Sequence, residues 1–278
     1  MLAQLCPPVL NETDTTCIRV SDLTRQRGFT DLPATLPEMF DHVTIGAADR
    51  EATRRFYRTV LPTLGYRPRA AGPEWGDFSI QQGGCGRPVT TRLHIGFAAA
   101  SHAHADAFWR AGVEAGYRDD GAPGPRPQYA EDYYGAFLLD PDGNSAEAVV
   151  HGRLRVGGCI DHLWIRVCDR TAAKRFYATV APHANFREVA ELADRTRYSR
   201  GPGQGSFSVV DGDPTTPFHL AFDVADRAAV ESFHGAATEA GFADNGPPGE
   251  RADYHPGYFA AFVLDPDGHN VEAVHHGG

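Results

Sequence analysis

The sequence predicts an α+β fold built from two copies of one domain. Three observations support this prediction: a long internal repeat, a regular alternation of strand and helix patterns inside each repeat, and an ordinary globular composition. The chain has 278 residues, of which 42% are hydrophobic and 22% are charged. That length suits two domains of common size, and that composition is typical of a soluble folded protein.

The internal repeat gives the domain boundaries. The segment "DHVTIGAADREATRRFYRTV" at 41–60 resembles "DHLWIRVCDRTAAKRFYATV" at 161–180. Near the end of each copy, "YYGAFLLDPDGNSAEAV" resembles "YFAAFVLDPDGHNVEAV" in the same way. We therefore predict an N-terminal extension over 1–38, followed by two domains over 39–152 and 158–277.

Each copy contains a strand–helix pattern that is written twice. In the first copy, the pattern predicts strands at 40–47, 77–82, 92–99, 133–140 and 145–151, and helices at 50–65 and 104–116. Asp49 is suited to cap the first helix, and Gly65 and Gly116 stand where helices should end. The order indicates two β-α-β-β-β modules in each domain, which form a mixed sheet with helices on its outside.

A glutamate recurs in the last strand of each copy. An Asp-Pro-Asp-Gly turn precedes it both times, with Gly143 and Gly268 able to adopt positive φ. Glu147 and Glu272 then lie among apolar residues, where an unpaired carboxylate would be costly to bury. They are either edge residues that face water or carboxylates with buried partners.

Four histidines occupy matching strand positions: His42, His94, His162 and His219. Alternation along each strand places them on a small or polar face, opposite the aliphatic face that packs against helices. These histidines lie far apart in the sequence, which excludes a local zinc motif. A curved sheet could still bring them together in one site. A strand histidine is often only hydrogen-bonded, so the residues alone leave both interpretations open.

Charge and cysteine content narrow the class of partner. The net charge of −10 disfavours nucleic acid and anionic membrane surfaces as partners. No apolar run is long enough to span a bilayer, and the first residues lack the features of a signal peptide. The five cysteines form no CxxC motif, so we expect a reduced, cytoplasmic protein that is a monomer or a homodimer.

The ordered set "FDHV…RFYRTVLPTLGY", "LHIGF…AFWRAGVEAG" and "YYGAFLLDPDGNSAEAV", found again in the second half, resembles the vicinal oxygen chelate superfamily. This superfamily includes glyoxalase I, extradiol dioxygenases, bleomycin-resistance proteins and thiol transferases. The resemblance implies paired βαβββ modules whose sheets curl into a metal-holding cup. Carried onto this chain, it implies one metal site in each half, with the ligands His42, His94 and Glu147, and His162, His219 and Glu272.

The resemblance departs from glyoxalase I at one position. A four-ligand glyoxalase I site needs a further carboxylate, but the corresponding strands read "DFSIQQ" and "GSFSVV". A three-ligand site is more similar to those of the dioxygenase and thiol-transferase branches. Its ligands suit Fe(II), Mn(II), Zn(II) or Ni(II).

Four residues are candidates for catalysis: Tyr129, Tyr254, His255 and Arg166. The two tyrosines are equivalent and precede the last strands, where a hydroxyl could bond substrate. His255 is a candidate acid or base near neutral pH. Because His255, Arg166 and Trp164 occur only in the second copy, we expect that copy to be better equipped for chemistry.

Three further side chains are expected to have structural or no roles. Tyr133 and Tyr258 should pack at the rim of the cup, and His276 should belong to a solvated tail. The leading functional hypothesis is a metal-dependent enzyme, dioxygenase-like, acting on a small catechol-like substrate. The alternatives are a glyoxalase- or thiol-transferase-type lyase or transferase, and a metal-free binding protein that sequesters an antibiotic.

Overall fold

The computed structural model describes residues 38–70, 74–84, 86–152, 155 and 157–277. Apart from Glu38, the expected N-terminal extension lies outside the described residues. The helices are α1 (Arg50–Val60), α2 (His102–Glu114), α3 (Arg170–Val180) and α4 (Arg227–Glu239), with the 3₁₀ turns η2 (Leu61–Leu64) and η3 (Ala181–His183) after α1 and α3. No helix among the described residues is both long and apolar enough to cross a membrane.

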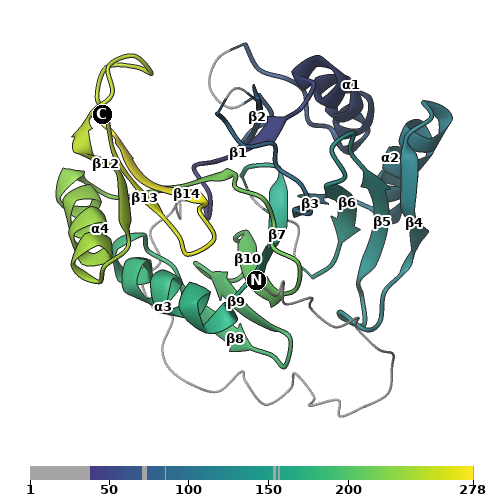
Figure 1. Cartoon of the computed structure of the whole chain (residues 1–278). Coiled ribbons are helices and arrows are strands. Elements are labelled where there is room, and N and C mark those ends of the chain that lie inside the picture. The colour runs from purple at the N-terminus through teal and green to yellow at the C-terminus, as the bar shows by residue number, and fades with distance from the viewer. Residues whose placement is uncertain (1–37, 71–73, 85, 153–154, 156, 278) are drawn as a thin grey trace, which may run out of the picture. The chain divides into compact units, whose positions relative to one another are not determined.

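The strands form two mixed sheets (Figure 1). The six-stranded sheet has the order β12 (Ala243–Glu250), β13 (Tyr258–Leu264), β14 (Asn270–His276), β11 (His219–Asp223), β1 (His42–Ala47) and β2 (Phe78–Gln82). The eight-stranded sheet has the order β4 (Arg118–Pro125), β5 (Tyr134–Leu139), β6 (Ser145–Val150), β3 (His94–Ala98), β7 (Ile160–Val167), β10 (Ser206–Asp211), β9 (Arg195–Ser199) and β8 (Arg187–Glu191).

This strand order confirms the α+β class but corrects one expectation about the sheets. Each sheet combines strands of both halves, because β1 pairs with β11 and β7 pairs with β3, both antiparallel. The sheets therefore do not follow the repeat boundary, and both belong to one compact unit over 37–278. The first half also has fewer strands than two complete β-α-β-β-β modules need, since between η2 and β2 the described residues form only an isolated bridge between Trp75 and Phe78.

The repeated helices are held by the same contacts in both halves. Asp49 caps α1 by accepting from the Ala52 backbone N–H at 3.0 Å, as expected, and Asp169 caps α3 in the same way. The Phe-Tyr pair of each helix is fully buried in the core. Each of these tyrosines donates its hydroxyl to the first aspartate of the Asp-Pro-Asp-Gly turn, Tyr57 to Asp140 and Tyr177 to Asp265.

The first aspartate of each Asp-Pro-Asp-Gly turn, Asp140 or Asp265, is therefore buried. Oδ1 of Asp265 accepts from the backbone N–H groups of Asp267 and His269 at 3.1 and 2.9 Å, while Gly268 has a φ of 84°. Burial raises the pKa of Asp265 to about 7, despite these hydrogen bonds. Burial likewise raises the pKa of Asp140 to about 6.

Replacing Asp265 should change the pH dependence of stability. Because the folded pKa lies above the unfolded value of 3.8, the native state binds this proton more tightly, and its stabilising contribution is lost as pH rises from about 4 to about 7. We expect the free energy of unfolding of Asp265→Asn to fall less than that of the wild type over this range. Urea denaturation at several pH values measures it, with exposed Asp253→Asn as the control. Parallel curves for Asp265→Asn and wild type would contradict this assignment.

Candidate metal centres

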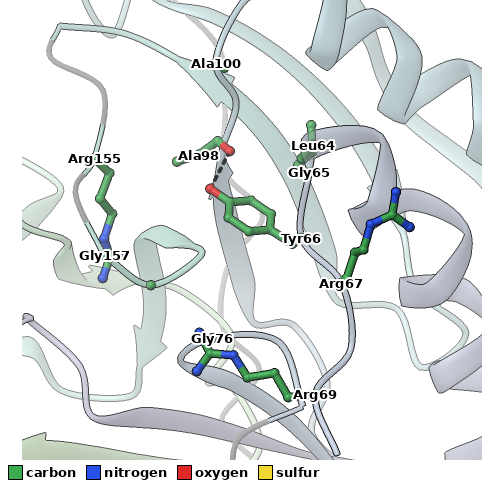
Figure 2. A pocket seen from close by; sticks show the side chains of 11 residues that line it. Leu64, Gly65, Tyr66, Arg67, Arg69, Gly76, Ala98, Ala100, Arg155 and Gly157 are labelled. Atoms are coloured by element: carbon green, nitrogen blue, oxygen red, sulfur yellow. Dashed lines mark hydrogen bonds between the residues drawn. The ribbon is translucent and has the colours of Figure 1, made fainter.

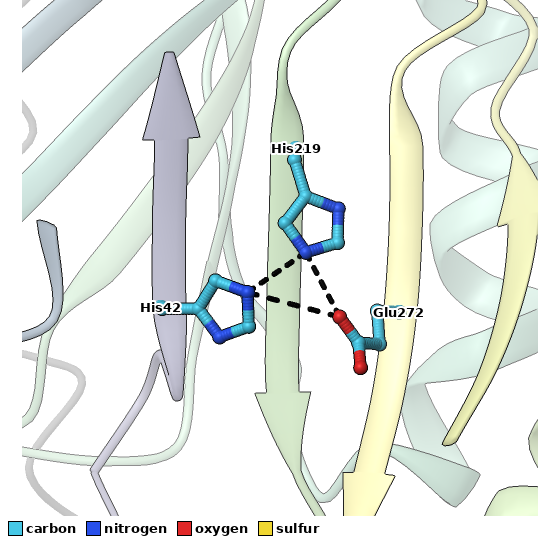
Figure 3. Close-up of side chains that lie close together, drawn as sticks. All are labelled: His42, His219 and Glu272. Carbon is cyan, nitrogen blue, oxygen red and sulfur yellow. Dashed lines mark hydrogen bonds and ion pairs between the residues drawn. The ribbon is translucent and has the colours of Figure 1, made fainter. Parts of the chain in front are cut away.

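The six residues expected to bind metal form two groups of three. In the first group, His42, His219 and Glu272 extend from β1, β11 and β14 toward one point (Figure 3). Nε2 of His219 lies 2.9 Å from Nε2 of His42 and 2.8 Å from Oε2 of Glu272. Nε2 of His42 lies 3.8 Å from the same carboxylate oxygen.

The second group has the same construction on β3, β6 and β7. Nε2 of His94 lies 3.0 Å from Oε2 of Glu147 and 3.1 Å from Nε2 of His162. Nε2 of His162 lies 3.3 Å from the same oxygen of Glu147. In each group, the donor atoms all lie within 4.8 Å of one another.

The grouping of these six residues differs from the expected one. Each group takes a histidine from one half and a histidine and a glutamate from the other, so the expected set of His42, His94 and Glu147 does not come together. The cause is strand register. In the second group, Gly96 of β3 lies opposite His162 on one neighbour and Glu147 on the other, and the His162 ring lies over Gly96, where a Cβ would clash with it.

Both glutamates have a buried tyrosine partner. The side chains of Glu147 and Glu272 are each 1% exposed. Tyr133 donates its hydroxyl to Oε1 of Glu147 at 2.8 Å, and Tyr258 donates to Oε1 of Glu272 at 2.7 Å. Burial raises the pKa of both tyrosines, which keeps them protonated as donors. The expectation that these tyrosines only pack at the rim was therefore wrong.

The charges of the second group favour an ionised carboxylate. Burial alone would raise the pKa of Glu147, but the hydrogen bonds with His162 and His94 outweigh it and lower that pKa to about 2. For His162, burial would lower the pKa, but hydrogen bonds with Asp161 and Glu147 raise it to about 9. Burial lowers the pKa of His94. At neutral pH the group therefore holds a carboxylate, a neutral His94 imidazole and a protonated His162, which must lose its proton before its Nε2 can bind a metal.

An aspartate orients one histidine in each group. Nδ1 of His42 lies 2.6 Å from Oδ1 of Asp41, and Nδ1 of His162 lies 2.8 Å from Oδ1 of Asp161. A carboxylate on the far nitrogen fixes the ring and leaves Nε2 directed into the group. The sequence analysis missed these residues, although the repeated Asp-His dipeptide was a signal for them.

Each of these aspartates also contacts a histidine near the end of the last strand of a half: His276 is the last residue of β14, and His151 follows β6. Nε2 of His276 lies 2.6 Å from Oδ2 of Asp41, and Nε2 of His151 lies 3.0 Å from Oδ1 of Asp161. His276 is therefore not part of a free solvated tail. Its Nδ1 lies 2.9 Å from Nε2 of His255, so His255 lies at the outer end of this chain of contacts.

The four candidate catalytic residues are divided between the two groups. Arg166 and Tyr129 line a cavity of about 310 Å³ that is also lined by His94 and Glu147. Tyr254 is 67% exposed and contacts Tyr258, beside the other group. Among the described residues, no His-His-Glu group comes from the second copy alone, and Arg166 of that copy lines the cavity beside His94 and Glu147.

Aromatic side chains form the walls of this cavity. The Trp164 ring lies 5.5 Å from the His94 ring and 5.6 Å from the Tyr129 ring, which is nearly perpendicular to it. The guanidinium of Arg195 lies 4.7 Å from the Trp164 ring centre. Phe137, which also lines the cavity, lies 6.1 Å from His94. The walls suit a flat, partly apolar molecule.

The first group has a different surrounding. The positions equivalent to Trp164 and Arg166 are Thr44 and Gly46. A Cβ at Gly46 would clash with the Pro88 carbonyl oxygen, so the chain near Pro88 lies where a side chain at residue 46 would project. The two groups thus share their His-His-Glu geometry but differ in the side chains that follow His42 and His162 on their strands.

Several solved structures have a similar architecture. Glyoxalase I from Zea mays superposes with a TM-score of 0.59 at 17% identity, over 85% of this chain and 92% of that chain. A variant of that protein has a TM-score of 0.61 at 16% identity, over 85% of this chain and 92% of that chain. A candidate dioxygenase from Bacillus subtilis subsp. subtilis strain 168 has a TM-score of 0.56 at 13% identity, over 87% of this chain and 86% of that chain. No protein-family profile and no curated protein sequence matches. The chain has the vicinal oxygen chelate fold, which confirms the resemblance at the level of the fold.

Removing the tyrosine hydroxyls should destabilise the protein. Tyr133→Phe and Tyr258→Phe each leave one oxygen of a buried carboxylate without its donor, at a cost of about 1–3 kcal/mol. We expect lower free energies of unfolding in urea for both variants. The control is Tyr129→Phe, since that tyrosine is 41% exposed. Equal stability of all three variants and the wild type would refute the proposed carboxylate contacts.

Proposed function

We propose that the chain is a metal-dependent enzyme that acts on a small, oxygen-bearing, catechol-like substrate at the group formed by His94, Glu147 and His162. The observation that carries this proposal is the aromatic-lined cavity of about 310 Å³ onto which His94 and Glu147 open. The cavity combines aromatic walls with charged side chains, among them Asp120, Arg126 and Arg166, and with a convergent set of metal-binding donors, as small-molecule sites often do.

The residues present fit a divalent metal. Two imidazole nitrogens and one carboxylate oxygen converge in each group, and the glutamate is almost fully buried. This donor set suits Fe(II), Mn(II), Zn(II) or Ni(II). A divalent metal bound there supplies Lewis-acid stabilisation of negative charge on substrate oxygens and leaves positions open for substrate and dioxygen.

The chain's own residues hold the donors and orient the substrate. Asp161 and Tyr133 fix His162 and Glu147 by the hydrogen bonds described above. Trp164 and Tyr129, whose rings meet nearly at a right angle, form adjoining walls of the cavity against which a flat ring would pack. Arg166 brings a permanent positive charge to the cavity, which favours a substrate oxygen that has lost its proton.

Ring-cleaving oxygenation is the reaction that we assign to this site. In that reaction both atoms of one dioxygen molecule enter the product as a ring C–C bond breaks, so no external reductant is needed. The three-ligand set supports it, since Ser206 and not a carboxylate lies opposite His162 on β10. That serine disfavours the four-ligand lyase alternative.

The first group is proposed as a second metal site without turnover. Its ligands match those of the second group, but Thr44 and Gly46 stand where the second group has Trp164 and Arg166, and the Pro88 carbonyl leaves no room for a side chain at residue 46. A bound metal there would connect β1 of the first half with β11 and β14 of the second. Its contribution would therefore be to stability.

Single histidine variants separate the two sites. We expect His162→Ala to lose one metal equivalent and at least about 100-fold in activity, because a direct ligand should matter at least as much as its hydrogen-bond partners. His42→Ala should lose the other equivalent and keep its activity. Elemental analysis of untagged protein gives the metal content, and oxygen uptake with catechol gives the activity.

Two results would contradict this proposal. Loss of oxygen uptake in His42→Ala but not in His162→Ala would place the reaction at the first group. Binding of catechol without any metal, unchanged in both variants, would instead favour the metal-free binding protein. Turnover is also measured with an added thiol. Turnover that requires the thiol and consumes no oxygen would indicate the lyase or transferase alternative.

A further inference from the structure

The far nitrogen of His94 contacts a serine that is bound in turn to an aspartate. Nδ1 of His94 lies 3.2 Å from Oγ of Ser145, and the Ser145 hydroxyl donates to Oδ2 of Asp120 at 2.7 Å. All three residues line the cavity of about 310 Å³ described above. A larger cavity, of about 410 Å³ and shown in Figure 2, has no histidine or carboxylate among the described residues that line it. The serine and the aspartate thus accompany the cavity that holds metal-binding donors.

Strand register and a β-bulge place this pair beside the histidine. Ser145 is paired with His94 where β6 runs parallel to β3. Asp120 is the extra residue of a bulge in β4, between the pairs that Asp119 and Gly121 make with β5. A bulge redirects the side chain of its extra residue, and here the Asp120 carboxylate reaches Ser145 across the intervening strand β5.

The proton positions in this chain of contacts follow from the groups that form it. A carboxylate only accepts hydrogen bonds, so the single hydroxyl proton of Ser145 is donated to Asp120. The Ser145 oxygen can then only accept from Nδ1 of His94, which must carry a proton. In the neutral ring the other nitrogen, Nε2, therefore has a free lone pair, which is the form that binds a metal.

The first group has two neutral amides at the equivalent positions, Asn270 and Asn245. Nδ1 of His219 lies 2.8 Å from Nδ2 of Asn270, whose Oδ1 accepts from Nδ2 of Asn245 at 2.9 Å. In this arrangement Asn270 donates to Nδ1, so the proton of a neutral His219 ring lies on Nε2, 2.8 Å from Oε2 of Glu272. If both amides turn over, every donor and acceptor is exchanged, so this pair does not fix the tautomer as a carboxylate does.

We propose that Ser145 and Asp120 are positioning residues that hold His94 in the tautomer with its proton on Nδ1, and thereby make the second group the tighter of the two metal sites. The second part of this inference rests on the proposed function, since it requires that the second group bind metal. Without the pair, the Glu147 carboxylate, 3.0 Å from Nε2, remains as an acceptor for the ring proton. A proton on Nε2 would block the nitrogen that binds the metal.

Zinc titration tests the effect of the pair on metal affinity. His42→Ala protein keeps only the second group complete, and competition with a chromophoric chelator gives the affinity of that group for Zn(II). Asp120→Asn and Ser145→Ala, each added to His42→Ala, should weaken it about 10–100-fold, the usual effect of losing a residue that orients a metal ligand. Because Asp120 is exposed, its variant should fold normally.

The matched control is Asp119→Asn, which removes the same charge one residue away. Oδ1 of Asp119 accepts from Nε1 of Trp109 and from the backbone N–H of Gly121, and an asparagine keeps both contacts. This variant should bind Zn(II) as tightly as its parent. Equal affinities of Asp120→Asn and Asp119→Asn would overturn the proposal, because the effect of Asp120 would then be one of charge alone.

The reciprocal exchange should strengthen the first group. In His162→Ala protein only that group is complete, and the double change Asn270→Ser with Asn245→Asp gives it the serine and the carboxylate of the second group. We expect Zn(II) to bind about tenfold or more tightly after this exchange. Unchanged or weaker binding would count against the proposal.

Nitrogen NMR of metal-free protein labelled at histidine tests the tautomer without any metal, with His94→Gln to assign the signals. The proposal predicts a proton on Nδ1 of His94 in the wild type and on Nε2 in Ser145→Ala. A proton on Nε2 in the wild type, or the same tautomer in both proteins, would overturn it. If the tautomer is as predicted but His42→Ala binds no Zn(II), the proposed function fails and the positioning role of the pair stands.

Discussion

The candidate sites depend on strand pairing between the two halves. β1 lies antiparallel to β11 with His42 opposite Ala221, and β7 lies antiparallel to β3 with His162 opposite Gly96. In both sheets this pairing forms a row in which a small residue separates a histidine from a glutamate, so the two long side chains meet above it. Neither half alone holds a complete group, and the sheets themselves are completed only when both halves fold together.

The two groups share this pairing but differ in their surroundings. Both groups retain the aspartate behind one histidine and the tyrosine on the glutamate, because a buried carboxylate without these partners would be expensive. The lining is under no such constraint. Around the second group it is aromatic and cationic, with Trp164 and Arg166, whereas the first group has Thr44 and Gly46 at these positions, with Pro88 against Gly46. A common framework thus carries two chemically different environments.

The sequence predicted the fold class and the six central residues because those signals are local. The repeated Phe-Tyr helices, the Asp-Pro-Asp-Gly turns and the alternation that places His94 beside Gly96 on one face are readable along the chain. Which histidines meet which glutamate could not be predicted, because alternation determines the face that a side chain occupies but not which strand lies next to it. Two halves with the same order of strand patterns can pair their strands with each other or within themselves, so only the structure distinguishes the pairings.

The central claim is that each metal centre is shared between the halves, and anomalous diffraction at the absorption edge of the metal that purifies with the protein tests it most directly. The account predicts an anomalous peak among His94, Glu147 and His162, with the second position among His42, His219 and Glu272. A peak coordinated by His42, His94 and Glu147 together, or metal bound at neither group, would contradict it.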